Sequence, residues 1–261
     1  EYLPNVPSDF ADAIMDWRGT NGIVSLDYTS LGYEAKYAPF ETVDELRLVY
    51  GATADLLAGE DINRNGVLDK SEKDLNGNGQ LDPGLLEYAT VYTREPNFHS
   101  DGSSLTNVNS EGDSTIRTLL QNAGISTSYV SQLMATNAGA RPYAGIFSFA
   151  LRCRNLGISS DDFSRLADDV TTSTNTYLRG RVNVNTACAD VLAAVFMGAS
   201  VNLDESTAES AAQTLVTYRQ QNPNNLNSVA WIIDALGNNS PVVTALAQGD
   251  WVTTHSYQFT A

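Results

Sequence analysis

The acidic segment from Asp61 to Asp82 (DINRNGVLDKSEKDLNGNGQLD) alternates Asp and Asn with other residues. An EF-hand calcium loop takes oxygen ligands from positions 1, 3, 5, 7, 9 and 12, with glycine at position 6. The first half of the segment fits each position, because one hard cation requires about six to eight converging oxygens. The predicted ligands are Asp61, Asn63, Asn65, the Val67 carbonyl, Asp69 and Glu72, with Gly66 at the turn.

The second half of the segment repeats this spacing with one departure. Its twelfth position is Leu85, which cannot ligate a cation, so Glu87 is the candidate replacement. The alternative is a solvated acidic turn or a flexible linker, but a linker has no reason to repeat the spacing of oxygens and glycine. The predicted ligands of this second site are Asp74, Asn76, Asn78, the Gln80 carbonyl, Asp82 and Glu87.

The two loops begin thirteen residues apart, which leaves no room for a helix between them. This spacing excludes a paired EF-hand sensor, whose helices reorient when calcium binds. It also argues against a dockerin, in which a helix follows each loop. We therefore expect a compact tandem calcium loop with a structural role, because the segment is too polar to build a core of its own.

Two common catalytic motifs are absent from the sequence. It contains neither the G-x-S-x-G nor the H-E-x-x-H pattern, and we expect its two histidines, His99 and His255, at surface or edge positions. Paired carboxylates fall near expected helix ends, where capping and solvation explain them. These pairs are Asp161-Asp162, Asp168-Asp169 and Asp204-Glu205, and the aromatic residues Trp17, Tyr50, Tyr218 and Trp231 are expected to pack in the core.

Composition restricts the classes of partner. The 261 residues carry a formal charge of −16, which argues against nucleic acid and against an anionic membrane surface. No apolar run approaches the roughly 20 residues of a membrane-spanning helix, and residue 1 does not begin a signal peptide, so we expect a soluble portion of a longer chain. Cys153 and Cys188 can either form one bridge or remain two separate buried thiols, and the second alternative is favoured.

Helical periodicity recurs along the chain and predicts a mainly α fold (α+β) of about three related helix–turn–helix units. In each unit an amphipathic helix is followed by a turn and a second short helix. The predicted first helices are Phe10–Arg18, Tyr129–Thr136 and Ala211–Arg219, and the second helices are Phe40–Val49, Ile146–Leu156 and Leu226–Leu236.

Extended segments complete these units. Leu105–Ser110 (LTNVNS) and Arg181–Thr186 (RVNVNT) each run into a helix, with Ser110 and Thr186 expected as N-caps and Asp113 completing a capping box after Ser110. Gly249–Phe259 alternates apolar and polar residues and predicts a strand. The expected domains are residues 1–104 with the calcium loops inserted at 60–84, then 105–204, 205–247 and a terminal strand at 248–261.

The asparagine-rich extended segments and the helices after them resemble small helix-hairpin-helix, or SAM-like, domains. Many such domains bind DNA phosphates through a Gly-Ile-Gly hairpin. The corresponding turn here, Phe196–Ser200 (FMGAS), lacks that hairpin and the chain is strongly acidic. The architecture is therefore expected without the DNA-binding function. The side chains of Asn107, Asn109, Asn183 and Asn185 are expected to tie the extended segments to neighbouring turns.

An ordered set of motifs resembles the type II secretion system protein K family, the large minor pseudopilins. The set comprises Asp16-Trp17, the Tyr33–Tyr37 segment, Phe40–Thr53 (FETVDELRLVYGAT) and Arg181–Ala187 (RVNVNTA). The resemblance covers roughly residues 11–53 and 181–259. The family's N-terminal apolar helix, its cleavage site and most of its pilin sheet have no counterpart here, and residues 85–180 are longer than the family pattern.

The resemblance implies a calcium-binding helical domain on a pilin-like body at the tip of a periplasmic pseudopilus. It further implies partners among minor pseudopilins of the I and J types, a role in protein transport across the outer membrane, and anchoring in the inner membrane before assembly through an N-terminal helix. We expect the 261-residue chain itself to be a monomer without enzymatic activity. The alternative is a calcium-dependent extracellular adhesion or binding module.

Overall fold

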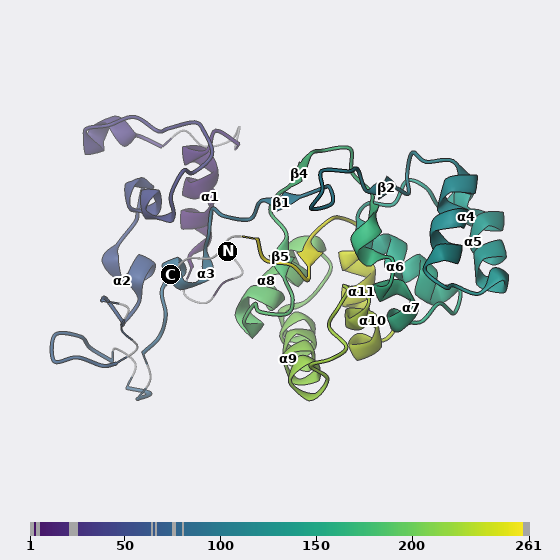
Figure 1. The fold of residues 1–261 in the computed structure, drawn as a ribbon. Coiled ribbons are helices and arrows are strands. Elements are labelled where there is room, and N and C mark those ends of the chain that lie inside the picture. The colour runs from purple at the N-terminus through teal and green to yellow at the C-terminus, as the bar shows by residue number, and fades with distance from the viewer. Residues whose placement is uncertain are drawn as a thin grey trace. The chain divides into compact units, whose positions relative to one another are not determined.

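A computed structural model describes residues 3, 6–20, 26–63, 65, 67–74, 77–79 and 81–257 (Figure 1). The chain divides into two compact units, Glu1–Tyr92 (unit 1) and Thr93–Ala261 (unit 2). The fold is mainly helical with short strand pairs, which confirms the expected class. No helix in the described ranges is long and apolar enough to span a membrane.

Unit 1 has a small core built around its first helix. Phe10, Ala13 and Trp17 of α1 are buried, because their spacing places them on one face of the helix. The Trp17 ring packs 5.4 Å from the Tyr28 ring, measured between centroids. The elements of unit 1 are α1 (Ser8–Trp17), the 3₁₀ helices η1 (Tyr28–Leu31) and η2 (Val43–Leu48), α2 (Ala54–Ala58) and α3 (Leu85–Tyr88).

The helix predicted over Phe40–Val49 is shorter than expected and is a 3₁₀ helix, η2. The Glu45 carboxylate draws the chain back at its start, because Oε1 accepts hydrogen bonds from the backbone N–H groups of Glu41 and Thr42. Oε2 binds Lys36 Nζ at 2.9 Å. These three bonds fix the entry of the chain and leave it extended before Val43. Tyr50, predicted to pack in the core, is 40% exposed.

The acidic segment leaves and re-enters unit 1 at one narrow point. Gly59 and Pro83 form an antiparallel bridge between α2 and α3. A Cβ atom on Gly59 would lie 2.3 Å from the Asp82 carbonyl oxygen, and one on Gly84 would lie 2.3 Å from the Gly59 nitrogen. Only glycine fits at either position, so the two backbones close the segment into a loop.

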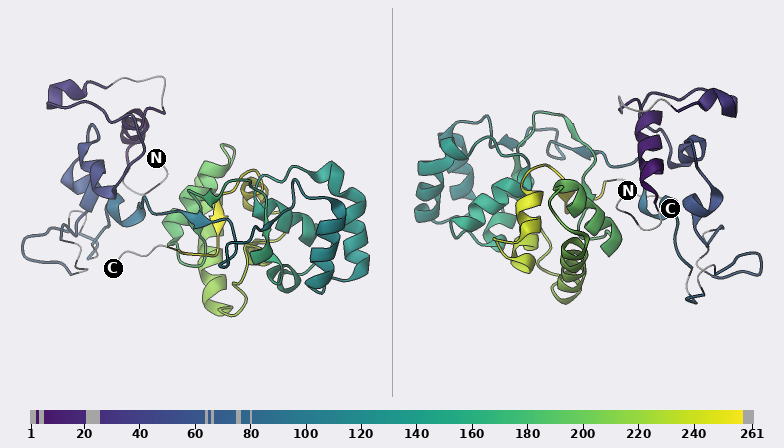
Figure 2. Two further views of the ribbon diagram at one scale, coloured as in Figure 1. Left: turned by 45° about the horizontal axis from the view of Figure 1, so that its top comes forward. Right: turned by 180° about the vertical axis from the view of Figure 1, so that it is seen from behind.

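Unit 2 contains two groups of helices, seen from further directions in Figure 2. Helices α4 and α5 pack together in the first group, as α8 and α9 do in the second. Both groups contribute to one apolar core. The first group is α4 (Asp113–Asn122), α5 (Thr127–Ala140), α6 (Ile146–Asn155), α7 (Ser160–Ser164) and η3 (Ala167–Asp169), and the second is α8 (Ala189–Ala199), α9 (Glu205–Gln221), α10 (Trp231–Leu236) and α11 (Pro241–Leu246).

A parallel strand pair brings together the two ends of each helical group. Strand β2 (Thr106–Asn107) pairs with β3 (Val170–Thr171), and β5 (Val182–Asn183) pairs with β6 (Val252–Thr253). A third, antiparallel pair joins β1 (Glu95–Pro96) to β4 (Tyr177–Leu178). Each helical group therefore begins and ends at the same place.

The asparagines of the extended segments make equivalent contacts in the two groups, as predicted. Asn109 Nδ2 donates to the Tyr143 and Thr172 carbonyls at 3.0 and 2.9 Å. Asn185 Nδ2 donates to the Leu226 carbonyl at 3.0 Å, and Asn185 Oδ1 accepts from Trp231 Nε1 at 3.0 Å.

The backbone beside each of these asparagines turns in the same way. Asn107 Oδ1 accepts from the Asn109 N–H, and Asn183 Oδ1 accepts from the Asn185 N–H, each at 2.9 Å. The prediction that these side chains tie extended segments to neighbouring turns is confirmed for Asn109 and Asn185, whereas the Oδ1 atoms of Asn107 and Asn183 bond within their own segments.

Two predicted N-caps are wrong. The N-cap of α4 is Gly112 rather than Ser110, and that of α8 is Cys188 rather than Thr186. The chain first turns back on Asn107 and Asn183, whose carbonyls accept two successive backbone N–H groups each. The helices therefore begin about two residues later than the sequence pattern indicates.

Two predicted elements are shorter in the structure. The helix expected over Leu226–Leu236 begins only at Trp231, since the Leu226 carbonyl accepts the Asn185 amide and the Trp231 N–H bonds to the Ser228 carbonyl in a tighter turn. The strand expected over Gly249–Phe259 is limited to β6, since the His255 N–H bonds back to Thr253 Oγ1 and turns the chain. Phe259 lies outside the described residues.

We expect Asn185→Ala to lower the free energy of unfolding of unit 2 by about 1–3 kcal/mol, since it leaves the buried Trp231 N–H without an acceptor. Chemical denaturation followed by tryptophan fluorescence measures this change. The matched control is Asn202→Ala, at an exposed position, which should leave stability within about 0.5 kcal/mol of wild type. Equal stability of the two variants would contradict a structural role for Asn185.

Candidate functional site

The first half of the acidic segment brings its predicted ligands together. Asp61 Oδ1 and Asn63 Oδ1 both accept the Asn65 backbone N–H, at 3.1 and 3.0 Å. The Asp69 carboxylate receives the side-chain amides of Asn63 and Asn65 at 2.8 and 2.9 Å. Four predicted ligand side chains thus share one small volume. Gly66, predicted at the turn, lies outside the described residues.

Glu72 closes this group from the opposite end of the loop. Its side chain is buried, with Oε1 accepting from the Asn63 N–H at 3.3 Å and Oε2 from the Asp69 N–H at 3.0 Å. Val67 is held next to the group because its N–H donates to Asn65 Oδ1 at 2.8 Å. The carboxylate predicted at the bidentate position therefore faces inward, although it is far along the chain from Asp61.

The second half of the segment is organised around Asp74. Its carboxylate accepts the backbone N–H groups of Gly77, Asn78 and Gly79 at 2.6, 3.1 and 2.7 Å. Asn78 Nδ2 reaches Asp82 at 3.3 Å. Asn76 and Gln80, also predicted as ligands, lie outside the described residues.

The predicted replacement ligand Glu87 does not join this second group. It lies exposed on α3, and within the described ranges no hydrogen bond links its side chain to the other predicted ligands. Leu85, at the twelfth position, is buried in the core of unit 1.

Glu60 is a member of the site that the sequence pattern did not identify. Its side chain is buried, and Oε2 accepts the Asp82 backbone N–H at 3.0 Å while its own N–H donates to the Asp82 carbonyl. An acidic residue directly before the first loop was the only signal. Glu60, directly before the first loop, is therefore bonded to Asp82 at the end of the second loop.

The donor set fits a hard cation rather than a soft one. It consists of carboxylate, amide and carbonyl oxygens without sulfur or imidazole, which is the chemistry that calcium prefers. Among the described residues, no group of three or more His, Cys, Asp or Glu side chains is arranged to hold a metal ion. Asparagine and backbone oxygens would have to complete the coordination, with the Asn63 and Asn65 amides turned from their present bonds to Asp69.

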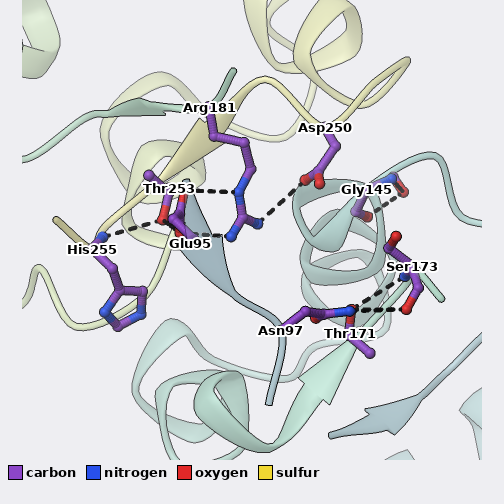
Figure 3. Close-up of polar contacts among 10 residues, drawn as sticks. Glu95, Asn97, Gly145, Thr171, Ser173, Arg181, Asp250, Thr253 and His255 are labelled. Carbon is purple, nitrogen blue, oxygen red and sulfur yellow. Dashed lines mark hydrogen bonds and ion pairs between the residues drawn. The ribbon is translucent and has the colours of Figure 1, made fainter. Parts of the chain in front are cut away.

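Unit 2 contains a second feature, a polar cavity of about 360 Å³. Arg181 lies on its wall and binds Glu95 through two hydrogen bonds of 3.1 and 2.7 Å (Figure 3). Asp250 approaches the same guanidinium from the other side at 3.5 Å, and Thr253 Oγ1 donates to Glu95 at 2.9 Å. One buried cation thus links β1, the start of β5 and the segment before β6.

Both histidines of the chain line this cavity and face one turn, η3. His255 Nε2 lies 3.2 Å from Asp168 Oδ1, and His99 Nε2 lies 3.9 Å from Asp169 Oδ1. The expectation that the histidines lie at surface or edge positions is partly right, because their side chains are 42% and 33% exposed. Their meeting at adjacent aspartates was not predicted.

The cavity shifts the acidity of several groups. The hydrogen bond to Asp168 raises the pKa of His255, and the same bond lowers the pKa of Asp168. Burial raises the pKa of Asp250, against the opposing effect of Arg181. Hydrogen bonding thus shifts the pKa values of His255 and Asp168, and burial shifts that of Asp250.

The remaining paired carboxylates and the two cysteines are accounted for by their places in the fold. Asp161 and Asp162 lie in the first turn of α7, and Asp204 caps α9 through the Thr207 N–H.

The two thiols are separate, as favoured, and burial raises the pKa of Cys153 to about 12. Cys188 is exposed, so its predicted burial is wrong.

Three of the four aromatic residues expected in the core pack there. Trp17 and Trp231 are buried, and Tyr218 stacks on Trp231 with ring centroids 5.6 Å apart.

Comparison of the chain with protein-family models, curated proteins and solved structures finds no match.

Proposed function

We propose that this chain is a non-catalytic assembly subunit whose tandem acidic loop is held by calcium. The convergence of Asp61, Asn63, Asn65, Asp69 and Glu72 within one closed loop carries this proposal. Six acidic and three basic side chains lie between residues 60 and 82. Without a cation the mutual repulsion of these carboxylates opposes the closed form, so calcium would supply charge compensation.

The proposed calcium sites are structural. The first loop would bind through the residues named above and the Val67 carbonyl, and the second through Asp74, Asn78 and Asp82, together with Asn76 and Gln80. Glu60 would keep the two loops closed through its bonds to Asp82. Because such a segment orders only when its charges are compensated, binding of the ion and folding of the loop would be one event.

We further propose that the helical body is modular. The equivalent bonds of Asn109 and Asn185, and the parallel strand pair at the ends of each helical group, support a duplicated unit within residues 105–172 and 181–254. The acidic loop would then be an insertion between α2 and α3 of unit 1. The resemblance to small helix-hairpin-helix modules is consistent with this repetition.

The assembly we propose is the tip of a type II secretion pseudopilus, with this chain as its K-type minor pseudopilin. The support is the ordered set of motifs around Trp17, in Phe40–Thr53 and in Arg181–Ala187. In this role the chain would act in the periplasm with minor pseudopilins of the I and J types. Its bulky helical body would end the filament, because an identical subunit stacked above it would collide.

The alternative is a calcium-dependent extracellular binding module. The polar cavity of unit 2 favours this alternative, because an assembly subunit does not require a ligand-sized cavity with Arg181, Asp250 and His255 on its walls. The two functions differ in whether the chain recognises other pseudopilins.

We expect calcium to raise the midpoint of thermal unfolding of metal-stripped protein by mass action, and chelation to reverse the increase. Glu72→Gln should abolish most of the increase, because it removes the inward-facing carboxylate of the first loop. Glu34→Gln, at an exposed position of the same unit, is the matched control and should behave like wild type. Identical calcium responses of Glu72→Gln and wild type would contradict the first site.

For the tip role we expect the 261-residue chain to sediment as a monomer, since its charge of −16 opposes self-association. The same chain joined at residue 1 to a long apolar pseudopilin helix should co-purify with the I and J types. Sedimentation velocity and co-purification measure the two results. A stable homo-oligomer, or a joined chain that binds neither partner, would favour the binding module.

A further inference from the structure

The cavity of unit 2 has an excess of negative charge. Its walls carry three carboxylates, from Glu95, Asp168 and Asp250, against the single guanidinium of Arg181. Arg181 is already bound to two of these carboxylates, bidentately to Glu95 and more loosely to Asp250. The cavity therefore has no uncommitted permanent cation among its described lining residues, whereas acceptor capacity remains.

Two carboxylates keep that capacity. Asp250 lies 3.5 Å from Arg181, longer than a normal hydrogen bond between charged groups, and is only 28% exposed. Asp168 is 73% exposed and has His255 as its ion-pair partner. Asp250 is the more desolvated of the two and its ion pair with Arg181 is long, so a new positive charge beside Asp250 is stabilised more than one beside the exposed Asp168.

Asn97 lies on the same wall but is not an open acceptor. It donates both its amide hydrogens, to the carbonyls of Ser173 and Asn175 at 3.1 and 2.7 Å. Its Oδ1 accepts no hydrogen bond from any residue that the structure describes and has no exposed surface for a ligand to contact. The case for a cationic ligand therefore rests on the two carboxylates.

The apolar part of the lining suits the stem of such a ligand. Phe98 and Tyr257 contribute aromatic rings, and Ile146 and Val229 contribute aliphatic side chains. Aromatic faces attract cations, and aliphatic walls cover methylene groups. The volume of about 360 Å³ falls within the range of small-ligand sites.

From this combination we infer that the cavity is a binding site for an alkylammonium or alkylguanidinium group, with Asp250 and Asp168 as its anionic partners. The cation is either a free amine or the side chain of a lysine or arginine on another protein. The site lies wholly in unit 2 and does not depend on the acidic loop of unit 1.

His255 makes this site sensitive to pH. The groups that face it are Asp168 from η3, Glu95 from β1 and Arg181 beside β5, with Tyr257 on its own segment. Its pKa is raised, so His255 is protonated below that pKa, where it neutralises Asp168 and repels a cationic ligand. Above the pKa it is neutral and Asp168 is left for the ligand. Binding should therefore strengthen as pH rises through the pKa of His255.

The test uses the two histidines as reporters, because the chain has no others. Butylammonium chloride is titrated into the protein, and the imidazole ¹H–¹³C signals of His99 and His255 are followed by NMR. We expect a saturable shift of both signals at pH 8 that weakens at pH 5.5. Butanol, of the same length without the charge, should give none.

Variants assign the shift to the cavity. Asp250→Asn should weaken the apparent affinity for butylammonium roughly tenfold, the effect of one charge-assisted contact. Asp168→Asn, at a more exposed position that should leave folding intact, should weaken it and remove most of the pH dependence. Asp161→Asn removes an exposed carboxylate of α7 and should leave the affinity unchanged.

A lysine-containing tripeptide with blocked ends distinguishes the two sources of the cation. Tighter binding of the tripeptide than of butylammonium assigns a protein side chain, and the reverse assigns a free amine. The inference is overturned if neither compound gives a saturable shift, if butanol shifts the signals equally, or if Asp161→Asn weakens binding as much as Asp168→Asn.

Discussion

The two ends of the acidic segment can meet only because Gly59 and Gly84 approach each other without side chains. This approach sets Glu60 opposite Asp82, so that backbone and carboxylate bonds seal the loop. It also keeps α2 and α3 adjacent, and with them the contribution of Leu57 and Leu85 to the core of unit 1. The cost of this closure is the crowding of carboxylates inside the loop, which a cation of suitable size would offset.

In unit 2, neutral asparagine side chains hold together the two ends of each helical group. Asn109 and Asn185 each draw the end of a helical group back to its beginning, through bonds to the Thr172 and Thr254 carbonyls. Arg181 meets Glu95 and Asp250 beside these ties. The cavity is lined by residues of both groups, among them Ala167 of η3 and Val229 before α10.

Short sequence patterns predicted which side chains of the acidic loop converge and which asparagines form ties. The spacing of Asp61, Asn63 and Glu72 predicted which side chains converge, and the repeated Asn-Val-Asn pattern predicted the amide ties. The identity of partners that lie far away in the chain was beyond such signals. Glu60 meets Asp82 across 22 residues, and Asp168 meets His255 only after the second helical group returns the chain. The bond between Asn185 and the Leu226 carbonyl, ahead of α10, likewise joins residues far apart in the chain.

The central claim, that calcium holds the acidic segment in its closed form, is tested most directly by amide hydrogen exchange of that segment. Exchange of residues 60–82 is measured by mass spectrometry in calcium and after chelation. The N–H groups of Asn63, Asn65 and Asp69 bond to the predicted ligands, so they should be protected in calcium and should exchange rapidly without it, while unit 2 is unchanged. Equal exchange of the segment in the two conditions would contradict the claim.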